Sequence, residues 1–445
     1  MSMHCGYCVK VTNLRPHTNA DRLQIATFFG NDTCVGLDVV KGEIGIYFPS
    51  DLQLSEEFCV ANHLCRKKPD GTPDTGYLDP EKRNIKPIKL RSEKSDGIFL
   101  PISCLEYTGI NLDDINIGDT VTVVNGHEIC KKYIPRGRAK SNAAKGKGNR
   151  TRKKHAPVAP LFTEHADTEQ LAYNLGAFKP GDEIEITLKM HGTSQRTAYL
   201  PVLKGYRRTI WDKLLGREGI PIYDWDYVSG TRRTVLDDWD GGFYGSNAFR
   251  KQHHDKFVGK LRKGEEVYYE ITSYTDNGTP IMSSCSVPKE YQNIYGDTME
   301  FSYGCSPDGG DVPQSDLYVY RMTMTNEDGD VVEYSPDFMR YRCEQMGVKC
   351  VPEFVHEFIP DQEWLDSMAL TAGEYVMGVA EQYYDGPDPI GKTHVREGVV
   401  VRIINRPKFC AYKHKNFLFK LITGIIVDKI ADSRDEIGED VLEEL

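Results

Sequence analysis

Polar and apolar side chains alternate in residues 183–187, Glu-Ile-Glu-Ile-Thr, and β-branched residues are frequent there. This period of two predicts a strand that runs over residues 181–189. Later segments are apolar and β-branched throughout, which is typical of buried strands. They are residues 267–273, 317–325, 398–404 and 417–422.

Helical spacing is found between these strands, and residues 247–262 also carry basic side chains on one side of the predicted helix. The predicted helices are residues 167–175, 247–262, 337–346 and 362–370. Strands and helices together predict an α+β fold whose second domain, residues 161–423, is built mainly on antiparallel sheets flanked by helices.

The N-terminal residues 1–125 have a different pattern. Five short apolar segments are separated by Asn, Gly and Pro turns, at residues 8–11, 23–28, 45–48, 85–91 and 97–102. So many short strands in so few residues predict a small barrel of the OB type that binds nucleic acid. Residues 16–23 resemble the opening of tRNA-binding OB modules. A small barrel used only for packing between domains is the alternative.

A basic segment separates the two predicted domains. Eleven Lys or Arg residues and no acidic residue lie between Lys131 and Lys154, in a chain of net charge −11. The remainder therefore carries about −22. We assign residues 126–160 as a flexible basic linker that could contact phosphates. A solvated tether or a localisation signal would have the same composition. Residues 424–445 are predicted to be a short tail or helix.

Composition places the 445 residues among ordinary globular proteins, with 39% hydrophobic and 27% charged residues. No apolar run approaches the ~18 residues of a membrane span, so no membrane partner is expected. Twelve scattered cysteines fit a reducing compartment better than a disulfide framework. The expected location is the cytoplasm, of a host cell if a phage encodes the chain.

The candidate chemistry begins where the first strand ends, at Lys189-Met190-His191-Gly192-Thr193-Ser194. A lysine among other cations and partly shielded from water can lose its proton and act as a nucleophile. The glycine lets the backbone approach a phosphate or sugar closely. Taken alone, the same residues could be a surface lysine beside an ordinary turn.

Further stretches have the composition of a pocket for a nucleoside triphosphate. Arginines that could fork a phosphate follow a glycine at residues 229–234, and carboxylates that could bind ribose or a metal occur on two later strands. A tyrosine could stack on a base, and two lysines alternate on one side of a strand. The side chains concerned are Arg232, Arg233, Glu270, Tyr320, Glu397, Lys413 and Lys415.

The order KxHGT, SGxRR, YxEI, YVYR, EGVVVR, YKxKN resembles the covalent nucleotidyltransferases, which include polynucleotide ligases and capping enzymes. The forms KMHGTS and YKHKN are most similar to RNA ligases of the second T4 phage type and to RNA-editing ligases. Residues 90–97, Leu-Arg…Ser-Asp-Gly, are similar to a smaller group of RNA ligases with a leading OB domain.

The resemblance implies an ATP-dependent RNA ligase that uses Mg²⁺ or Mn²⁺ and seals a 3′-OH/5′-phosphate nick in duplex RNA, acting as a monomer. Lys189 would attack the α-phosphate of ATP and release pyrophosphate, and the AMP would then pass to the 5′-phosphate of the nick. The 3′-hydroxyl would attack this adenylylated end and release AMP. The implied roles are nucleotide contacts for His191, Gly192, Thr193, Arg232 or Arg233, Glu270 and Tyr320, metal binding for Glu397, and α-phosphate contacts for Lys413 and Lys415.

Some features depart from the family pattern. Ser194 replaces an asparagine, Leu188 an acidic residue and Tyr269 a glycine, and an insertion at residues 201–228 separates the first two motifs. The glutamates could instead be salt-bridge partners of Arg402 and Lys415, and both Tyr320 and His191 could be core residues. Two other functions stay open: a capping-type guanylyltransferase, and a non-catalytic RNA-binding protein.

Overall fold

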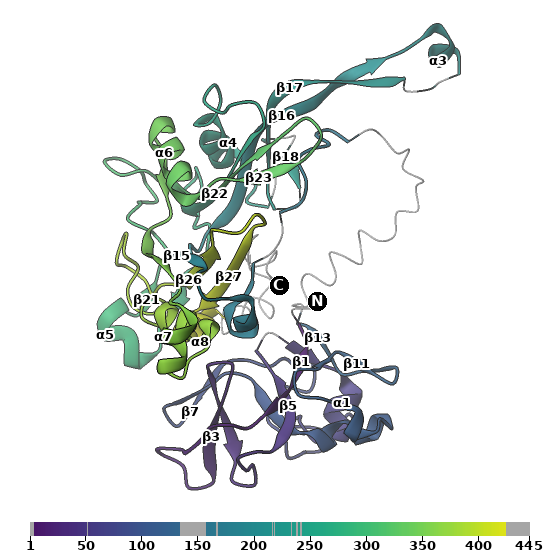
Figure 1. The fold of residues 1–445 in the computed structure, drawn as a ribbon, viewed down its shortest axis with the longest axis vertical. Helices are drawn as coiled ribbons and strands as arrows, with labels where there is room; N and C mark the ends of the chain where they lie inside the picture. Colours follow the sequence, from purple (N-terminus) through teal and green to yellow (C-terminus); the bar gives the residue numbers. More distant parts are fainter. Residues whose placement is uncertain are drawn as a thin grey trace. The chain divides into compact units, whose positions relative to one another are not determined.

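The computed structural model describes residues 4–50, 52–133, 157–165, 168–215, 217, 219–232, 234–236, 239–240 and 243–423, without the side chains of Lys213 and Leu214. These residues divide into two compact units (Figure 1). Residues up to 133 and residues 420–423 form the first unit, and residues 157–419 form the second. Most of the predicted linker, the tail at 424–445 and Arg233 lie outside the described residues.

The first unit is made of short strands and one helix, as the Gly- and Asn-rich spacing predicts. Its elements are β1 (Gly6–Lys10), β2 (Leu14–Pro16), β3 (Leu23–Phe28), β4 (Asn31–Gly36), β5 (Ile44–Phe48), β6 (Leu52–Leu54), α1 (Glu56–Ala61), β7 (Ile88–Leu90), β8 (Glu93–Ser95), β9 (Ile98–Pro101), β10 (Thr120–Val121), β11 (Val123–Val124), β12 (His127–Glu128) and β13 (Cys130–Lys132).

These strands form separate small antiparallel sheets, of which the largest has the order β10-β1-β5-β9 and the next β2-β3-β4. A core of buried residues that includes Ile46, Phe48, Leu54 and Phe58 joins the largest sheet to β6 and α1. Phe28 of β3 stacks on Phe99 of β9 with a centroid distance of 4.9 Å. No closed barrel is formed by the hydrogen-bonded strands of the described residues 4–133. The assignment of an OB domain therefore stays a prediction, whereas the mainly β character of the unit agrees with the expected short strands.

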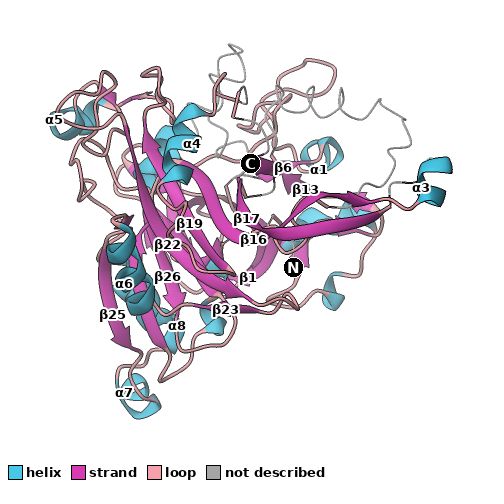
Figure 2. Ribbon diagram, turned by 90° about the horizontal axis from the view of Figure 1, so that it is seen from above, coloured by secondary structure: helices cyan, strands magenta, loops and turns pink. Residues whose placement is uncertain are grey.

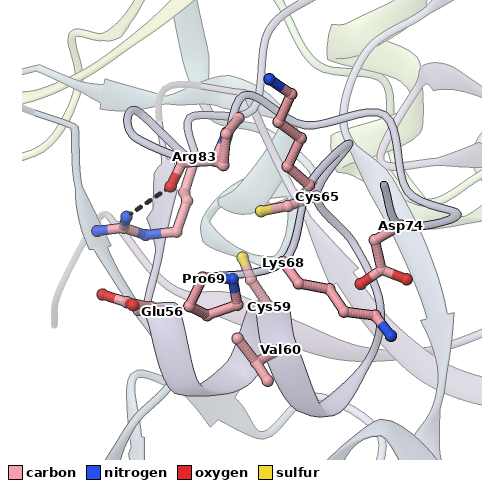
Figure 3. Close-up of a pocket in the computed structure, with 10 residues that line it drawn as sticks. Glu56, Cys59, Val60, Cys65, Lys68, Pro69, Asp74 and Arg83 are labelled. Carbon is pink, nitrogen blue, oxygen red and sulfur yellow. Dashed lines mark hydrogen bonds between the residues drawn. The ribbon is translucent and has the colours of Figure 1, made fainter. Parts of the chain in front are cut away.

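One small pocket of the first unit lies beside α1 (Figure 3). Cys59 and Cys65 line it, together with Lys68, Asp74 and Arg83. Burial raises the pKa of the Cys59 thiol, which keeps that thiol protonated. The volume of about 40 Å³ is far below the roughly 300 Å³ at which ligand sites begin, so the pocket cannot hold a nucleotide.

The second unit contains the longer strands and most helices. Its elements are β14 (Glu169–Gln170), β15 (Glu183–Leu188), β16 (Thr193–Arg207), α3 (Ile210–Leu214), β17 (Ile220–Gly230), β18 (Val235–Leu236), α4 (Ala248–Asp255), β19 (Glu265–Ser273), β20 (Cys285–Ser286), α5 (Gln292–Tyr295), β21 (Thr298–Met299), β22 (Ser315–Thr325), β23 (Val331–Glu333), α6 (Pro336–Met346), β24 (Lys349–Cys350), β25 (Glu353–Phe358), α7 (Gln362–Ser367), α8 (Ala372–Glu381), β26 (Gly398–Ile403) and β27 (Cys410–Lys415).

Two mainly antiparallel sheets organise this unit (Figures 1 and 2). The five-stranded sheet has the order β14-β27-β26-β15-β25, and the seven-stranded sheet has the order β18-β17-β16-β19-β22-β23, with β24 beside β22. The chain crosses from the first sheet to the second between Leu188 and Thr193. This crossing segment contains Lys189, so the candidate nucleophile lies where both sheets meet.

The predicted strands of this unit are confirmed with one exception, and the α+β class holds. Residues 417–422 were expected to form a strand because they are apolar, but residues 417–423 are helical. The Asn416 side chain accepts hydrogen bonds from the N–H groups of Leu418 (2.7 Å) and Phe419 (3.3 Å). Such an N-cap starts a helix, and apolarity alone cannot distinguish a buried helix from a strand.

The predicted helices are present but differ in length. Residues 248–255 form α4, which is shorter than the predicted helix at 247–262. α6 begins one residue before the predicted segment 337–346, and α7 lies inside the predicted segment 362–370. Residues 171–173 and 175–177 form two short 3₁₀ turns where one helix was expected. Within the described ranges, no helix is both long and apolar enough to cross a bilayer.

The stability of this unit should depend on pH through a buried histidine of α4. His253 is 1% exposed and its Nε2 lies 2.9 Å from the Ser315 Oγ. Burial, with the cations of Lys256 and Arg250, lowers the pKa of His253 to about 3. The unfolded chain gains this proton near pH 6.5 and the folded chain does not, so stability is lost as the pH falls below about 6.5.

We therefore expect His253→Gln to lose less free energy of unfolding than the wild type between pH 7 and pH 5. Below pH 6, the wild type should lose about 1.4 kcal/mol more free energy of unfolding per pH unit than His253→Gln. Urea unfolding at several pH values measures it. His356→Gln, at a ring that is 26% exposed, is the control. Parallel pH profiles for wild type and His253→Gln would contradict this assignment.

Candidate active site

Lys189 lies one residue beyond β15, and its position is fixed by the five-stranded sheet. The Lys189 N–H donates to the Gly398 carbonyl at 3.0 Å, which continues the pairing of β15 with β26. The Lys189 side chain is 12% exposed. Thus the strand predicted from the alternating pattern delivers a nearly buried ammonium group to the crossing between the sheets.

A carboxylate meets this ammonium group directly. The Nζ of Lys189 lies 2.8 Å from the Oε1 of Glu397, and the Nζ of Lys415 lies 3.2 Å from the same oxygen. The Glu397 side chain is only 2% exposed. Charges that are this close and this well shielded from water interact more strongly than a pair on the surface. Glu397 therefore holds two lysines from different strands at one point.

Strand pairing explains why these residues meet. Gly398, the first residue of β26, pairs with Lys415, and Val400 pairs with Lys413. Lys413 and Lys415 are two residues apart on β27, so both point to the same face of the sheet. A Cβ on Gly398 would lie 2.0 Å from the His414 carbonyl oxygen, so only glycine permits this close pairing next to Glu397.

His191 combines packing with a polar contact, so core packing is part of its environment, and its role toward a nucleotide stays a prediction. Its ring lies between Phe301 and Phe419, with centroid distances of 4.6 and 4.7 Å and edge-on geometry. Its Nδ1 lies 3.5 Å from the Oε2 of Glu397. The His191 N–H donates to the Tyr303 hydroxyl at 2.8 Å. The histidine thus supports the Glu397 carboxylate from within an aromatic cluster.

The turn after His191 passes very close to β19. A Cβ on Gly192 would lie 2.2 Å from the Ile271 carbonyl oxygen and 3.1 Å from the Glu270 Cγ. Glycine is therefore required here by close approach, whatever its backbone angles. Thr193 and Ser194 then pair with Ile271 and Glu270 across the sheet. The turn places Lys189 and Glu270 on either side of Gly192.

Tyr320 lies at an irregularity of the sheet. In the register of β19 and β22, Tyr268 faces Arg321 and Tyr269 faces Val319, so Tyr320 is the extra residue of a bulge. Bulges re-aim side chains next to functional sites. The Tyr320 hydroxyl lies 3.4 Å from the Ser194 Oγ. Ser194 therefore makes a contact in this site although it replaces the asparagine of the family pattern.

Electrostatic effects link the remaining candidates to the same site. Burial and the nearby Glu270 carboxylate raise the pKa of Tyr320, and the Arg232 cation opposes this rise. Burial raises the pKa of Tyr303 well above its ordinary value, with the carboxylates of Glu397 and Glu270 among the further causes. Both carboxylates thus act on one tyrosine. These contacts and effects connect the described candidates except Lys413, which is placed only by its pairing with Val400, and Arg233 lies outside the described residues.

Arg250 and Tyr303 belong to this site but were not among the predicted site residues. Arg250 of α4 is completely buried, and its guanidinium donates to the Ser194 carbonyl (3.1 Å) and to the Thr193 hydroxyl. The basic character of residues 247–262 was a signal for Arg250. Nothing in the sequence around Tyr303 indicated its role.

The alternative that the two glutamates are salt-bridge partners of Arg402 and Lys415 agrees with the structure only in part. Glu397 does pair with Lys415, as that alternative expects, but it also pairs with Lys189. Arg402 bonds instead to Glu333, at 3.4 Å, and to the Tyr334 carbonyl. The site is therefore an arrangement of lysines around one carboxylate, with a second carboxylate, a tyrosine and an arginine beside it.

A divalent metal fits this donor set only in part. No group of three His, Cys, Asp or Glu side chains with metal-ligand geometry exists among the described residues of either unit. Glu397 is the carboxylate closest to the candidate nucleophile. Magnesium is usually held by one or two carboxylates with substrate phosphates and waters, so a single glutamate is compatible with a metal that arrives with a nucleotide.

The overall structure is similar to solved structures of an RNA ligase from Naegleria gruberi. A lysine-to-methionine variant with AMP and manganese matches with a TM-score of 0.51 and 15% identity, covering 95% of this chain and 98% of that chain. An aspartate-to-alanine variant without ligand also has a TM-score of 0.51 at 15% identity, covering 97% and 100%. The chain has an RNA-ligase fold.

This RNA-ligase fold extends over both units, because the match covers nearly the full length of both proteins. The same enzyme with pyrophosphate matches with a TM-score of 0.50, at 14% identity and with 96% of this chain covered. No family model and no curated protein sequence matches the chain. At this identity the similarity concerns the fold, and the chemistry has to be argued from the residues.

The position of the crossing turn should depend on Arg250. Arg250→Met would remove the donor to two buried acceptors, the Thr193 hydroxyl and the Ser194 carbonyl. We expect a loss of roughly 3 kcal/mol in the free energy of unfolding, measured with urea. Lys251→Met is the matched control, since it removes only an exposed pair with Asp255 and should cost less than about 1 kcal/mol. Equal losses for both variants would contradict a role of Arg250 in holding the turn.

Proposed function

We propose that this protein is an ATP-dependent RNA ligase that seals 3′-OH/5′-phosphate nicks in duplex RNA through a lysyl-AMP intermediate. The observation that carries the proposal is the contact of Lys189 and Lys415 with one oxygen of Glu397, at 2.8 and 3.2 Å, next to the Gly192 turn. The Naegleria gruberi ligase of the same fold is described with ATP, AMP, pyrophosphate and manganese.

In this proposal the chain's own residues prepare Lys189 for attack on the α-phosphate. Glu397 attracts the amine of Lys189 and fixes its position, and the adjacent Lys415 ammonium repels a positive charge on Lys189. Because both lysines contact one oxygen, the Glu397 carboxylate holds the two ammonium groups close together. Lys413 and Lys415 would neutralise the phosphates, which makes the α-phosphorus easier to attack.

The second half of the site would bind the nucleoside. Glu270 would accept hydrogen bonds from ribose hydroxyls, and the Tyr320 ring would stack on adenine. Arg232, with Arg233 beside it in the sequence, would contact phosphate or ribose, while His191, Gly192 and Thr193 form the turn around the nucleotide. Mg²⁺ or Mn²⁺, when bound, would be held by Glu397 with phosphate oxygens and would neutralise negative charge there.

The first unit and the basic linker would grip the RNA in this proposal. The small β-sheets of the first unit are compatible with the OB-like, nucleic-acid-binding domain expected for residues 1–125. The function of the first unit would be to hold the nicked duplex while the second unit carries out the chemistry. We propose that the enzyme acts as a monomer in the cytoplasm.

Labelled nucleotides distinguish this proposal from its rivals. Purified protein is incubated with Mg²⁺ and either α-labelled ATP or α-labelled GTP, and the protein is analysed on a denaturing gel. A label from ATP that pyrophosphate removes is the expected result. A label from GTP would point to a capping-type guanylyltransferase. Absence of label, after mass spectrometry has excluded a pre-adenylylated preparation, would favour a non-catalytic RNA-binding protein.

A further inference from the structure

The insertion between the first two motifs forms a two-stranded arm. β16 and β17 pair from Arg196↔Gly230 to Arg207↔Ile220, but β19 pairs with β16 only as far as Ala198. Beyond that point the two strands continue as a ribbon, with α3 at its far end (Figures 1 and 2). At 3.3 Å per residue, β16 extends roughly 27 Å from Tyr199 to Arg207. We call residues 199–227 the arm and residues 204–222 its tip.

The base of the arm is packed, whereas its tip exposes apolar side chains. Leu200, Val202 and Val228 join a cluster with Ala159 and Phe162. At the tip, large apolar residues are unusually exposed, and a two-stranded ribbon alone has little stability in water. These residues are Ile210 (80% exposed), Trp211 (72%), Leu215 (58%), Ile220 (66%) and Ile222 (45%).

The tip is also basic within an acidic chain. Residues 204–220 contain five Lys or Arg and two acidic residues, a net charge of +3, whereas the whole chain has −11. Arg207, Arg208 and Arg217 are all exposed. The rest of the chain carries about −14. A positive tip is therefore complementary to a polyanion, and not to a surface whose positive and negative charges balance.

We propose that the tip of the arm binds RNA at a distance from the break, and this rests on the proposed ligase function. Trp211 would stack on an unpaired base, and Arg207, Arg208 and Arg217 would contact the adjoining phosphates. Ile210 and Leu215 would cover the edges of the stacked base. β16 starts at Thr193, only four residues after Lys189, so the arm continues directly from the active site.

This arrangement selects a class of substrate. An arm of this length reaches RNA that lies well outside the nick, and Trp211 requires a base that is not paired. The preferred substrate is therefore a broken RNA whose duplex leads into a loop or a single-stranded end, as in a cleaved stem-loop. A plain nicked duplex would engage the active site and could meet only the arginines of the tip.

Binding measurements on the full-length protein test the arm separately from the chemistry. Two labelled RNAs are compared by fluorescence anisotropy: a nicked hairpin with a loop, and the same nicked duplex without the loop. Trp211→Ala should weaken binding of the hairpin roughly 10-fold and leave the loopless duplex within about twofold. Trp364→Ala, at a half-exposed tryptophan of α7, is the matched control and should change neither. Arg207→Ala/Arg208→Ala should reduce the salt dependence of binding by about two ions for the hairpin.

Equal affinity of wild type and Trp211→Ala for the hairpin would overturn the proposal. Sedimentation provides a second decision, since a wild-type dimer that Trp211→Ala converts to a monomer would mean that a second copy covers the tip, and RNA binding by the tip would be rejected. Labelling with ATP is measured on the same samples. Failure of labelling in all samples, wild type included, would refute the ligase function, whereas loss of hairpin binding in Trp211→Ala alone concerns only the arm.

Discussion

Lys189→Ala is expected to abolish the covalent adduct between the protein and AMP, a loss of more than about 1,000-fold in the rate of adduct formation. The amine of Lys189 lies at a buried carboxylate, with a second lysine at the same oxygen, and the turn that contains Gly192 follows directly in the chain. Labelling with α-labelled ATP, followed by a denaturing gel, measures the adduct.

The fold should survive this substitution, because the Lys189 backbone bond to Gly398 does not involve the side chain. Circular dichroism and urea unfolding check that point. Lys408→Ala, at an exposed lysine of the same unit, serves as the control and should label normally. If Lys189→Ala still became labelled, another lysine would be the nucleophile, and Lys413 and Lys415 would be the first residues to examine.

Glu397→Gln should reduce adduct formation by at least about 100-fold while the fold is retained. Glutamine has the same shape as glutamate but no charge, so Lys189 and Lys415 would face each other without the carboxylate that now separates them. The glutamate expected to bind a metal would also be lost. Rates of labelling at several Mg²⁺ concentrations measure both effects.

A matched control separates this effect from general damage to the unit. Glu357 accepts a hydrogen bond from the Tyr375 hydroxyl at 2.9 Å on the edge strand β25, and Glu357→Gln should label at the wild-type rate. Glu397→Asp keeps the charge and should restore part of the rate. Wild-type labelling by Glu397→Gln would show that this carboxylate is a structural partner of Lys415 and nothing more.

The strands that deliver Lys189, Glu397 and Lys415 could be predicted from the sequence because each combines a clear pattern with a family motif. β15 alternates with a period of two, and β26 is an apolar run. The motifs then indicated which side chains meet. What the motifs could not give is that both lysines share one oxygen of Glu397, since this follows from the register Gly398↔Lys415.

Contacts between distant parts of the chain could not be predicted. Arg250 reaches Ser194 across 56 residues, and Tyr303 reaches His191 across 112 residues. Neither contact leaves a periodic signal, because each is made by a single side chain. Similarly, Tyr320 owes its direction to a bulge in the pairing of β19 with β22, and such a shift of register is set by the partner strand.

The conformation of the arm could not be predicted from the sequence either. The sequence indicated an insertion at residues 201–228, but not that its two halves pair into a ribbon with exposed Trp211 at the end. Exposed and half-buried side chains alternate through residues 220–224 of β17, but the sequence Ile-Pro-Ile-Tyr-Asp has no alternation of polar and apolar residues that would show it. The register of a hairpin also depends on its turn. The exposure of the tip became visible only in the folded chain, and it is what leads from the site to a substrate.

Sealing of a nick tests the central claim most directly. Wild-type protein, ATP and Mg²⁺ are mixed with an RNA duplex that carries one nick with a labelled 5′-phosphate, and the products are separated over time on a sequencing gel. We predict a transient strand that carries AMP on its 5′ end, followed by the joined strand, with both absent in Lys189→Ala. Formation of the protein–AMP adduct without any joined strand would contradict an RNA ligase and leave only a nucleotidyltransferase.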